Sequence, residues 1–339
     1  MSHNRTLLER PLRLAALALL PLSLAAAGGA CSEAVLKDPG ALPDSGISGL
    51  DAGDDVVIPV NDGGDEPVDA GSIPVTKDVT IIVEPSDKGQ ALIDSMKNAK
   101  KSLHVTMYLL TGSSFINAIK DAHTAGRDVK VVLNQNFPTG TSDNLPAFNQ
   151  LKGAGVQVVW SPPAFAFTHE KCVIVDGTEA WIMTMNATFS APTDNREYLV
   201  VDTDAKDVAQ AEALFQGDFT DRSVRAPGKL IVSPVNARDA LKALLRGATS
   251  TIDVEVEGLS DDQIVAELGA AQKSGKSVRV VLDGSQPFSP AEQTAVTTLK
   301  GQGVKLVKRS TPAIHAKAIV VDGARAFVGS QNFTSNPLL

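Results

Sequence analysis

An internal repeat across the last three quarters of the chain is the sequence feature that most restricts the fold. The apolar run at residues 129–133 reappears at residues 278–282, an offset of 149 residues. The same offset relates two further strand candidates, residues 102–109 and 251–258. Because each copy is far longer than one solenoid unit, the repeat indicates a duplicated domain.

Length differences between the copies fall in the connecting segments. The offset is 148 residues at Gly155 and Gly303, and it is 146 residues at His169 and His315. Within each copy, short apolar runs alternate with helical stripes, a pattern typical of α/β units around a mixed sheet. We therefore expect two pseudo-symmetric α/β repeats with the active site at the interface between them.

The repeat also sets the expected domain boundaries. The first half covers residues 77–225 and the second covers residues 226–339. The terminal strand and helix at residues 198–219 have no counterpart in the second copy, so we expect that copy to be cut short at its C-terminus.

The same polar string stands at the matched place in each half. A lysine follows each histidine by two residues, an aspartate follows five residues later, and an asparagine lies ten residues beyond the aspartate. Alternate residues of a strand face one side, so each histidine and its lysine are expected to point together. The string comprises His169, Lys171, Asp176, Thr184 and Asn186 in the first half, and His315, Lys317, Asp322, Ser330 and Asn332 in the second.

These residue types suit a phosphate diester. Lysines, hydroxyls and amides can hold the non-bridging oxygens, while two imidazoles perform nucleophilic and acid–base steps. Two histidines with an aspartate could in principle bind zinc. However, lysine lies at the nearest position and no acidic cluster surrounds either histidine, so a mechanism without metal or other cofactor is favoured.

The doubled string closely resembles the phospholipase D superfamily, whose members carry His-x-Lys-x4-Asp twice. The resemblance covers roughly residues 77–339 and implies that one histidine attacks phosphorus to give a phosphohistidine. The other histidine then protonates the leaving alcohol and activates water, or admits another alcohol. It implies attack by His169, acid–base work by His315, phosphate contacts from Lys171, Lys317, Asn186, Asn332, Thr184 and Ser330, and structural roles for Asp176 and Asp322.

The family also places an acid behind a catalytic histidine. Glu197, which lies 28 residues after His169, fits this role, although a solvated loop acid is the alternative interpretation. The equivalent of Glu197 in the second half would fall near position 343, beyond Leu339, so the sequence does not decide whether the chain is fully active. Tyr108 and Glu257 occupy equivalent strand ends, where packing or solvent contact is expected rather than contact with substrate.

The substrate is less constrained than the reaction. The aromatic residues near the first histidine could form an apolar rim for acyl chains, stack on nucleobases, or pack the loop. The net charge of −8 is concentrated in residues 32–76, so residues 77–339 are nearly neutral and lack a broad basic field. The aromatics are Trp160, Phe165, Phe167 and Phe288.

Phospholipid is therefore the expected substrate, with hydrolysis of a headgroup ester as the reaction and a membrane surface as the partner. The alternatives are a nuclease or other phosphodiesterase, and a non-catalytic phosphate-binding surface protein. Because both strings stand in one chain, a monomeric catalytic unit is expected.

The N-terminal segment has the pattern of an export signal. Arginines precede an apolar run at residues 14–27, which is too short to span a bilayer, and small residues lead to Cys31. Residues 1–31 are therefore expected to direct the chain to the cell envelope, lipid-anchored through Cys31, or to the exterior. Residues 32–76, rich in Asp, Gly and Pro, predict a disordered acidic spacer.

Overall fold

The computed structural model describes residues 78–138, 140–221 and 228–334. The candidate signal, Cys31 and the acidic spacer lie outside these residues. The two sequence copies correspond to two α/β halves, each with its own mixed sheet and its own apolar core.

The sheet of the first half has the strand order β1-β7-β6-β5-β2-β3-β4. Strands β2, β3 and β4 run parallel to one another, and the other neighbours within this order pair antiparallel. The strands are β1 (Val79–Glu84), β2 (Ser102–Met107), β3 (Asp128–Leu133), β4 (Gln157–Trp160), β5 (Lys171–Val175), β6 (Glu179–Met183) and β7 (Asn195–Asp202).

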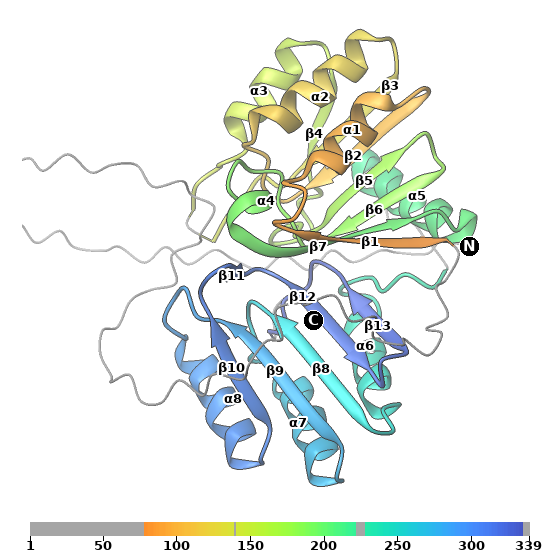
Figure 1. Ribbon diagram of the computed structural model, residues 1–339. Helices are drawn as coiled ribbons and strands as arrows, with labels where there is room; N and C mark the ends of the chain where they lie inside the picture. The colour runs from red at the N-terminus through yellow and green to blue at the C-terminus, as the bar shows by residue number, and fades with distance from the viewer. Residues whose placement is uncertain (1–77, 139, 222–227, 335–339) are drawn as a thin grey trace, which may run out of the picture. The chain divides into compact units, whose positions relative to one another are not determined.

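Helices cover both faces of this sheet (Figure 1). One face packs against α1 (Gln90–Asn98), α2 (Ser113–Thr124) and α3 (Leu145–Gly153). The other packs against α5 (Ala205–Thr220), whose Val208, Ala211 and Phe215 contact apolar side chains of β3, β5 and β6. The short helix α4 (Ala191–Asp194) leads into β7.

The second half repeats the central part of this arrangement. Its sheet has the order β10-β9-β8-β12-β13, in which β8, β9 and β10 are parallel and β12 is antiparallel to both neighbours. The elements are α6 (Ala237–Arg246), β8 (Thr251–Val256), α7 (Asp262–Lys273), β9 (Ser277–Asp283), α8 (Pro290–Gly301), β10 (Lys305–Arg309), β11 (Ala313–Ile314), β12 (Lys317–Val321) and β13 (Arg325–Val328).

One short strand of the second half joins the first sheet. β11 pairs in parallel with the start of β7, where Ala313 lies opposite Asn195 and Ile314 opposite Arg196. This pairing brings the residues that follow β11 to the first residues of β7, and both segments carry candidate site residues.

The two copies differ at their beginnings. Strand β1 pairs along its whole length with β7. The matched segment at residues 230–234 forms no strand, because the described part of the second half offers it no equivalent of β7. Among the described residues, no helix is long and apolar enough to cross a membrane.

Candidate active site

The two His-x-Lys strings have the same local geometry. Each histidine stands two residues before a lysine that begins a central strand, β5 in the first half and β12 in the second. Lys171 and Lys317 are fully buried, and each Nζ donates a hydrogen bond to the carbonyl of its own histidine, at 2.8 Å and 2.7 Å respectively. The repeated sequence therefore builds the same half-site twice.

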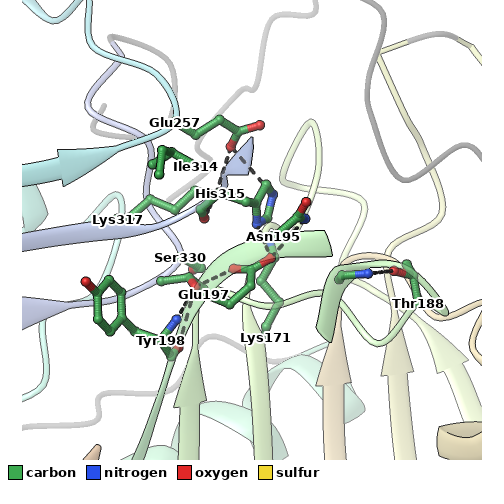
Figure 2. A network of polar contacts seen from close by, with 12 residues as sticks. Lys171, Thr188, Asn195, Glu197, Tyr198, Glu257, Ile314, His315, Lys317 and Ser330 are labelled. Carbon is green, nitrogen blue, oxygen red and sulfur yellow. Dashed lines mark hydrogen bonds and ion pairs between the residues drawn. The ribbon is translucent and has the colours of Figure 1, made fainter. Parts of the chain in front are cut away.

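Glu197 belongs to the first half but contacts the histidine of the second. Its Oε1 lies 2.7 Å from His315 Nδ1 (Figure 2). Its other oxygen accepts a hydrogen bond from the hydroxyl of Thr184. Asn195 Nδ2 donates to Oε1 over 3.4 Å. Glu197 is completely buried, so this carboxylate is fixed and can orient the imidazole of His315.

His169 is held by a backbone carbonyl of the second half. Its Nδ1 lies 2.9 Å from Ser330 O. Because a carbonyl oxygen only accepts, Nδ1 carries the proton and a neutral ring keeps a lone pair on Nε2. Each half thus supplies the group that holds the other half's imidazole.

Burial and nearby cations favour a neutral His169. Burial lowers its pKa well below the usual value, the charges of Lys171 and Lys317 lower it further, and Glu257 partly offsets them. The pKa of Lys171 is also lowered, first by burial and then by Lys317. The influence of Lys317 on both first-half groups indicates that the two strings share one site.

Glu257, for which packing or solvent contact was expected, lies within this network. A single carboxylate oxygen, Oε2, is 2.7 Å from Lys317 Nζ, 3.5 Å from His315 Nε2 and 3.1 Å from Asn332 Nδ2. Burial raises the pKa of Glu257, but Lys317 and His315 outweigh burial and hold it well below its usual range. The carboxylate is therefore ionised and paired.

Tyr108 occupies the matching position in the first half and packs on the site. Its ring lies edge-on to the imidazole of His169, with 4.4 Å between centroids, and Lys171 Nζ is 4.7 Å from the ring centroid. Burial raises the pKa of Tyr108 to about 12, with a further contribution from Glu257. The sequence offered one signal for both residues, namely their equivalence in the repeat.

Of the two expected hydroxyl ligands, one is engaged by a carboxylate and the other residue contacts a histidine through its backbone. Thr184 is fully buried and donates to Glu197, while Ser330 contacts His169 through its carbonyl oxygen. The amide nitrogen of Asn332, the group that could donate to a phosphate, donates to Glu257 instead, and the amide oxygens of both asparagines can only accept. Within the described segments, the Oδ1 atoms of Asn186 and Asn332 are buried without a hydrogen-bond partner.

The aspartates of the two strings lie at the far ends of their strands. Asp176 accepts backbone hydrogen bonds from residues 100–102, and Asp322 accepts them from residues 249–251. Both residues adopt a left-handed backbone conformation, with φ of 57° and 56°. Each aspartate thus ties a hairpin to the start of the neighbouring strand.

Two buried asparagines that the sequence did not single out support the first half-site. The side chain of Asn144 bonds the backbone of Leu110, Tyr108 and Asn134. Asn134 Oδ1 then accepts from the backbone nitrogen of Thr168, the residue before His169. Their signal in the sequence is weak, because polar loop residues usually face solvent.

The aromatic residues divide between packing and exposure. Trp160 stacks on Phe148, and Phe167 packs beside Tyr108. Phe288 packs on the second core with Lys308 over its ring. Phe165 is exposed. Another exposed aromatic side chain is Phe189, which lies three residues after Asn186 and was not singled out.

No metal cluster is present in the part of the chain that the structure describes. There, no group of three or more His, Cys, Asp or Glu side chains is arranged to hold a metal ion. Cys172, whose side chain lies on the sheet face covered by α5, is buried in the apolar cluster there and is a free thiol.

The sequence matches a known family over most of its length. The family described as "Cardiolipin synthase, PLD-like domain" matches residues 92–219 and 241–338. Cardiolipin synthase 2 of Bacillus anthracis is 24% identical over 294 residues, which cover 72% of this chain and 56% of the relative. The chain therefore spans about half the length of this curated relative.

Solved structures share the fold at low sequence identity. Polyphosphate kinase of Porphyromonas gingivalis superimposes with a TM-score of 0.58 and 16% identity, covering 76% of this chain and 46% of that one. Phosphatidylserine synthase of Haemophilus influenzae gives a TM-score of 0.51 and 11% identity, covering 73% and 76%.

The expected α/β fold with two pseudo-repeats is confirmed. With a family match over more than half of its residues, the chain belongs to the PLD-like domain family of cardiolipin synthase, within the phospholipase D superfamily.

Proposed function

We propose that the chain is a phosphodiesterase of the phospholipase D class that cleaves a phospholipid headgroup ester without a metal ion. The observation that supports this most directly is the exchange of histidine partners between the halves. His169 Nδ1 contacts Ser330 O, and His315 Nδ1 contacts Glu197, so both rings can present Nε2 to one phosphate. A module that only binds phosphate has no need of two oriented imidazoles.

His169 is the nucleophile in this proposal. Its ring is neutral, and a lone pair on Nε2 attacks phosphorus while the bond from phosphorus to the headgroup oxygen breaks. His315 gives its Nε2 proton to the departing oxygen, and Glu197 stabilises the positive ring before the transfer.

Water completes the cycle. His315, now neutral, takes a proton from water, and the resulting hydroxide attacks the phosphohistidine. The bond from phosphorus to His169 breaks, and phosphatidic acid leaves. Lys171 is placed to stabilise the charge that develops on the non-bridging oxygens, because it is buried beside His169.

An alcohol in place of water would make the same site a transferase. Two of the similar proteins are named synthases, which supports phosphatidyl transfer as a second candidate for this chemistry.

The near-neutral composition of residues 77–339 and the exposed Phe165 support a lipid substrate over nucleic acid. The chain's export, and its anchoring through Cys31, remain proposals that depend on residues 1–31.

The test is turnover by the purified full chain in EDTA. Phosphatidylcholine and phosphatidylglycerol vesicles, with and without glycerol, are assayed beside single-stranded DNA. Release of phosphatidic acid supports hydrolysis, and a new phosphatidyl alcohol supports transfer. Cleavage of DNA alone would replace this proposal with a nuclease.

The matched variants are His169→Ala and His315→Ala, with His123→Ala, at a half-buried position of α2, as a control. Both site variants should lose turnover, and the control should retain it. In single-turnover experiments with a p-nitrophenyl ester, whose leaving group needs no proton from His315, His315→Gln should accumulate phosphate label on the protein and His169→Ala should not. Turnover that survives either site substitution would contradict the assigned roles, and turnover that requires a divalent cation would contradict the metal-free mechanism.

A further inference from the structure

Tyr108 and Glu257 stand at structurally equivalent positions of the two half-sites. The backbone nitrogen of each donates to the carbonyl of the residue that follows the histidine, Glu170 in the first half and Ala316 in the second, at 3.0 Å in both cases. The duplicated backbone is therefore conserved in detail at this point, while one side chain is neutral and the other is an ionised carboxylate.

The carboxylate of Glu257 takes the position in which a phosphate oxygen would bind the second half. Its Oε2 contacts Lys317 Nζ, His315 Nε2 and Asn332 Nδ2 at 2.7, 3.5 and 3.1 Å. These three groups are the ones that the second string contributes for an anion. Lys317 Nζ and Asn332 Nδ2 thus already have an anionic partner, whereas His315 Nε2, at 3.5 Å, is not hydrogen-bonded to it and stays available to the leaving oxygen. Figure 2 shows Glu257 beside Lys317 and His315.

The first half-site holds no such internal anion. Lys171 Nζ donates to the carbonyl of His169 and faces the ring of Tyr108, and no ion pair to Lys171 is found within the described ranges. Among the described residues, the lysine without a paired carboxylate is therefore the one beside His169, the residue that attacks phosphorus in the proposed function.

The charges of the site then suit a ligand with one negative charge. Burial lowers the pKa of Lys171, and a bound phosphate, as a neighbouring anion, favours its charged form. With both lysines then protonated, the carboxylates of Glu197 and Glu257 offset them, and a protonated His315 leaves one net positive charge. A phosphodiester carries one negative charge, whereas a phosphomonoester carries nearly two above about pH 6. Without Glu257 the site would hold a second positive charge and would favour the monoester.

We propose that Glu257 is a specificity-determining residue that permanently fills the anion position of the second half-site and thereby restricts the site to singly charged phosphodiesters. This inference rests on the proposed phosphate site, and it adds the residue that selects among phosphates. It also means that the phosphomonoester product, phosphatidic acid, is held less strongly than its charge would otherwise dictate.

The test compares two small probes that differ by one charge. Methyl phosphate is largely a dianion at pH 8, and dimethyl phosphate is a monoanion. Their dissociation constants are measured by calorimetry for the full chain and for Glu257→Gln, which keeps the side-chain size. The parent should bind dimethyl phosphate at least as tightly as methyl phosphate.

In Glu257→Gln, the affinity for methyl phosphate should rise at least about tenfold relative to the affinity for dimethyl phosphate. Glu255→Gln is the matched control, because it removes the same charge two residues earlier, where the carboxylate accepts a hydrogen bond from Tyr198. An amide oxygen can still accept that bond, and the ratio of the two affinities should stay within about twofold of the parent.

Two outcomes would overturn the inference. If Glu257→Gln raised the affinities for methyl phosphate and dimethyl phosphate equally, every anion would simply displace Glu257 in the parent. If neither affinity changed, the carboxylate would not affect the selection between the two phosphates. Glu257→Tyr, which copies Tyr108, provides a second variant should the buried lysine destabilise the glutamine form. Because binding is measured without turnover, failure of the catalytic proposal would appear separately, as absence of phosphatidic acid.

Discussion

Thr184 donates its hydroxyl proton to Glu197, and Glu197 in turn contacts His315 Nδ1. The threonine therefore acts through the carboxylate and fixes which oxygen faces the imidazole. The backbone nitrogen of Tyr198 also donates to the Thr184 hydroxyl, at 2.9 Å, so the hydroxyl cannot easily rotate away. This chain of contacts predicts a graded response to substitution.

Glu197→Gln should lower kcat by about 10²–10⁴-fold, because an amide cannot stabilise the imidazolium of His315 and can select the wrong tautomer. Thr184→Val, which leaves one carboxylate oxygen without its donor, should lower kcat less. Thr184→Ser keeps the hydroxyl and serves as the control. The measurement is kcat for each folded variant, and a Glu197→Gln value within about threefold of the parent would contradict the role of this carboxylate.

The predictable part of the site lies in residues whose type and spacing repeat. His169 and His315, and their lysines, are recognisable because two matched strings are far less probable than one. Glu257 was expected to pack or to face solvent; its equivalence with Tyr108 in the repeat marks the position, but it does not specify a charged contact, because the two side chains differ in chemistry. Ser330 acts through its backbone carbonyl, which the identity of a side chain does not reveal.

At the scale of elements, α5 covers the strand that begins at Lys171. Glu170 lies just before that strand and is influenced by Asp218 of α5. Burial raises the pKa of Glu170 to about 8, with a further contribution from Asp218. Burial likewise raises the pKa of Asp218 to about 6, with a contribution from Asp221. Two acids thus share a poorly solvated region between helix and sheet.

These pKa values make the docking of α5 sensitive to pH. An unfolded chain loses the Glu170 proton near about pH 4.3, while the folded chain keeps it to about pH 8. Between these values the folded state binds more protons, so the free energy of unfolding falls as pH rises and stays low above pH 8. Glu170→Gln should therefore raise Tm relative to the parent more at pH 8 than at pH 5.

The matched control is Asp121→Asn, which removes an exposed carboxylate of α2. Its change in Tm should be the same at the two pH values. Thermal unfolding monitored by circular dichroism is sufficient for the comparison. A Glu170→Gln difference that does not vary with pH would show that the carboxyl is well solvated in the folded chain.

Most elements follow from local sequence pattern, and the exceptions depend on pairing. Residues 230–234 match the start of the first copy in sequence, yet only the first copy forms a strand there, because β7 pairs along the whole of β1. Strand β11 has two residues and exists through its pairing with β7. The local sequence predicts neither the missing strand at residues 230–234 nor the presence of β11, because a strand at a sheet edge forms only where a neighbouring strand pairs with it.

For the whole molecule, the two halves have separate apolar cores but a shared site. The contacts between the halves include β11 against β7, His315 with Glu197, His169 with the Ser330 carbonyl, Tyr198 with Glu255, and Gln210 with Leu230. Each core should therefore stay folded when the chain between the halves is cut, whereas the shared site should be lost when the two halves are separated.

Cutting the chain between residues 221 and 228 should give two fragments that are inactive alone and active when refolded together. The expectation follows from the distribution of the site, because Glu197 and His315 lie on different fragments. Turnover is measured for each fragment and for the mixture. A mixture whose second fragment carries His315→Ala is the control and should stay inactive, and turnover by a single fragment would contradict a shared site.

The exchange of histidine partners makes catalysis depend on how one core is aligned with the other. A small rotation between them would leave both sheets and their internal hydrogen bonds intact. It would nevertheless separate His315 from Glu197 and His169 from the Ser330 carbonyl in a single movement. Gentle warming or dilute denaturant would then abolish turnover while the circular dichroism spectrum remained native. Loss of turnover would therefore be the first sign that the two halves have moved relative to each other.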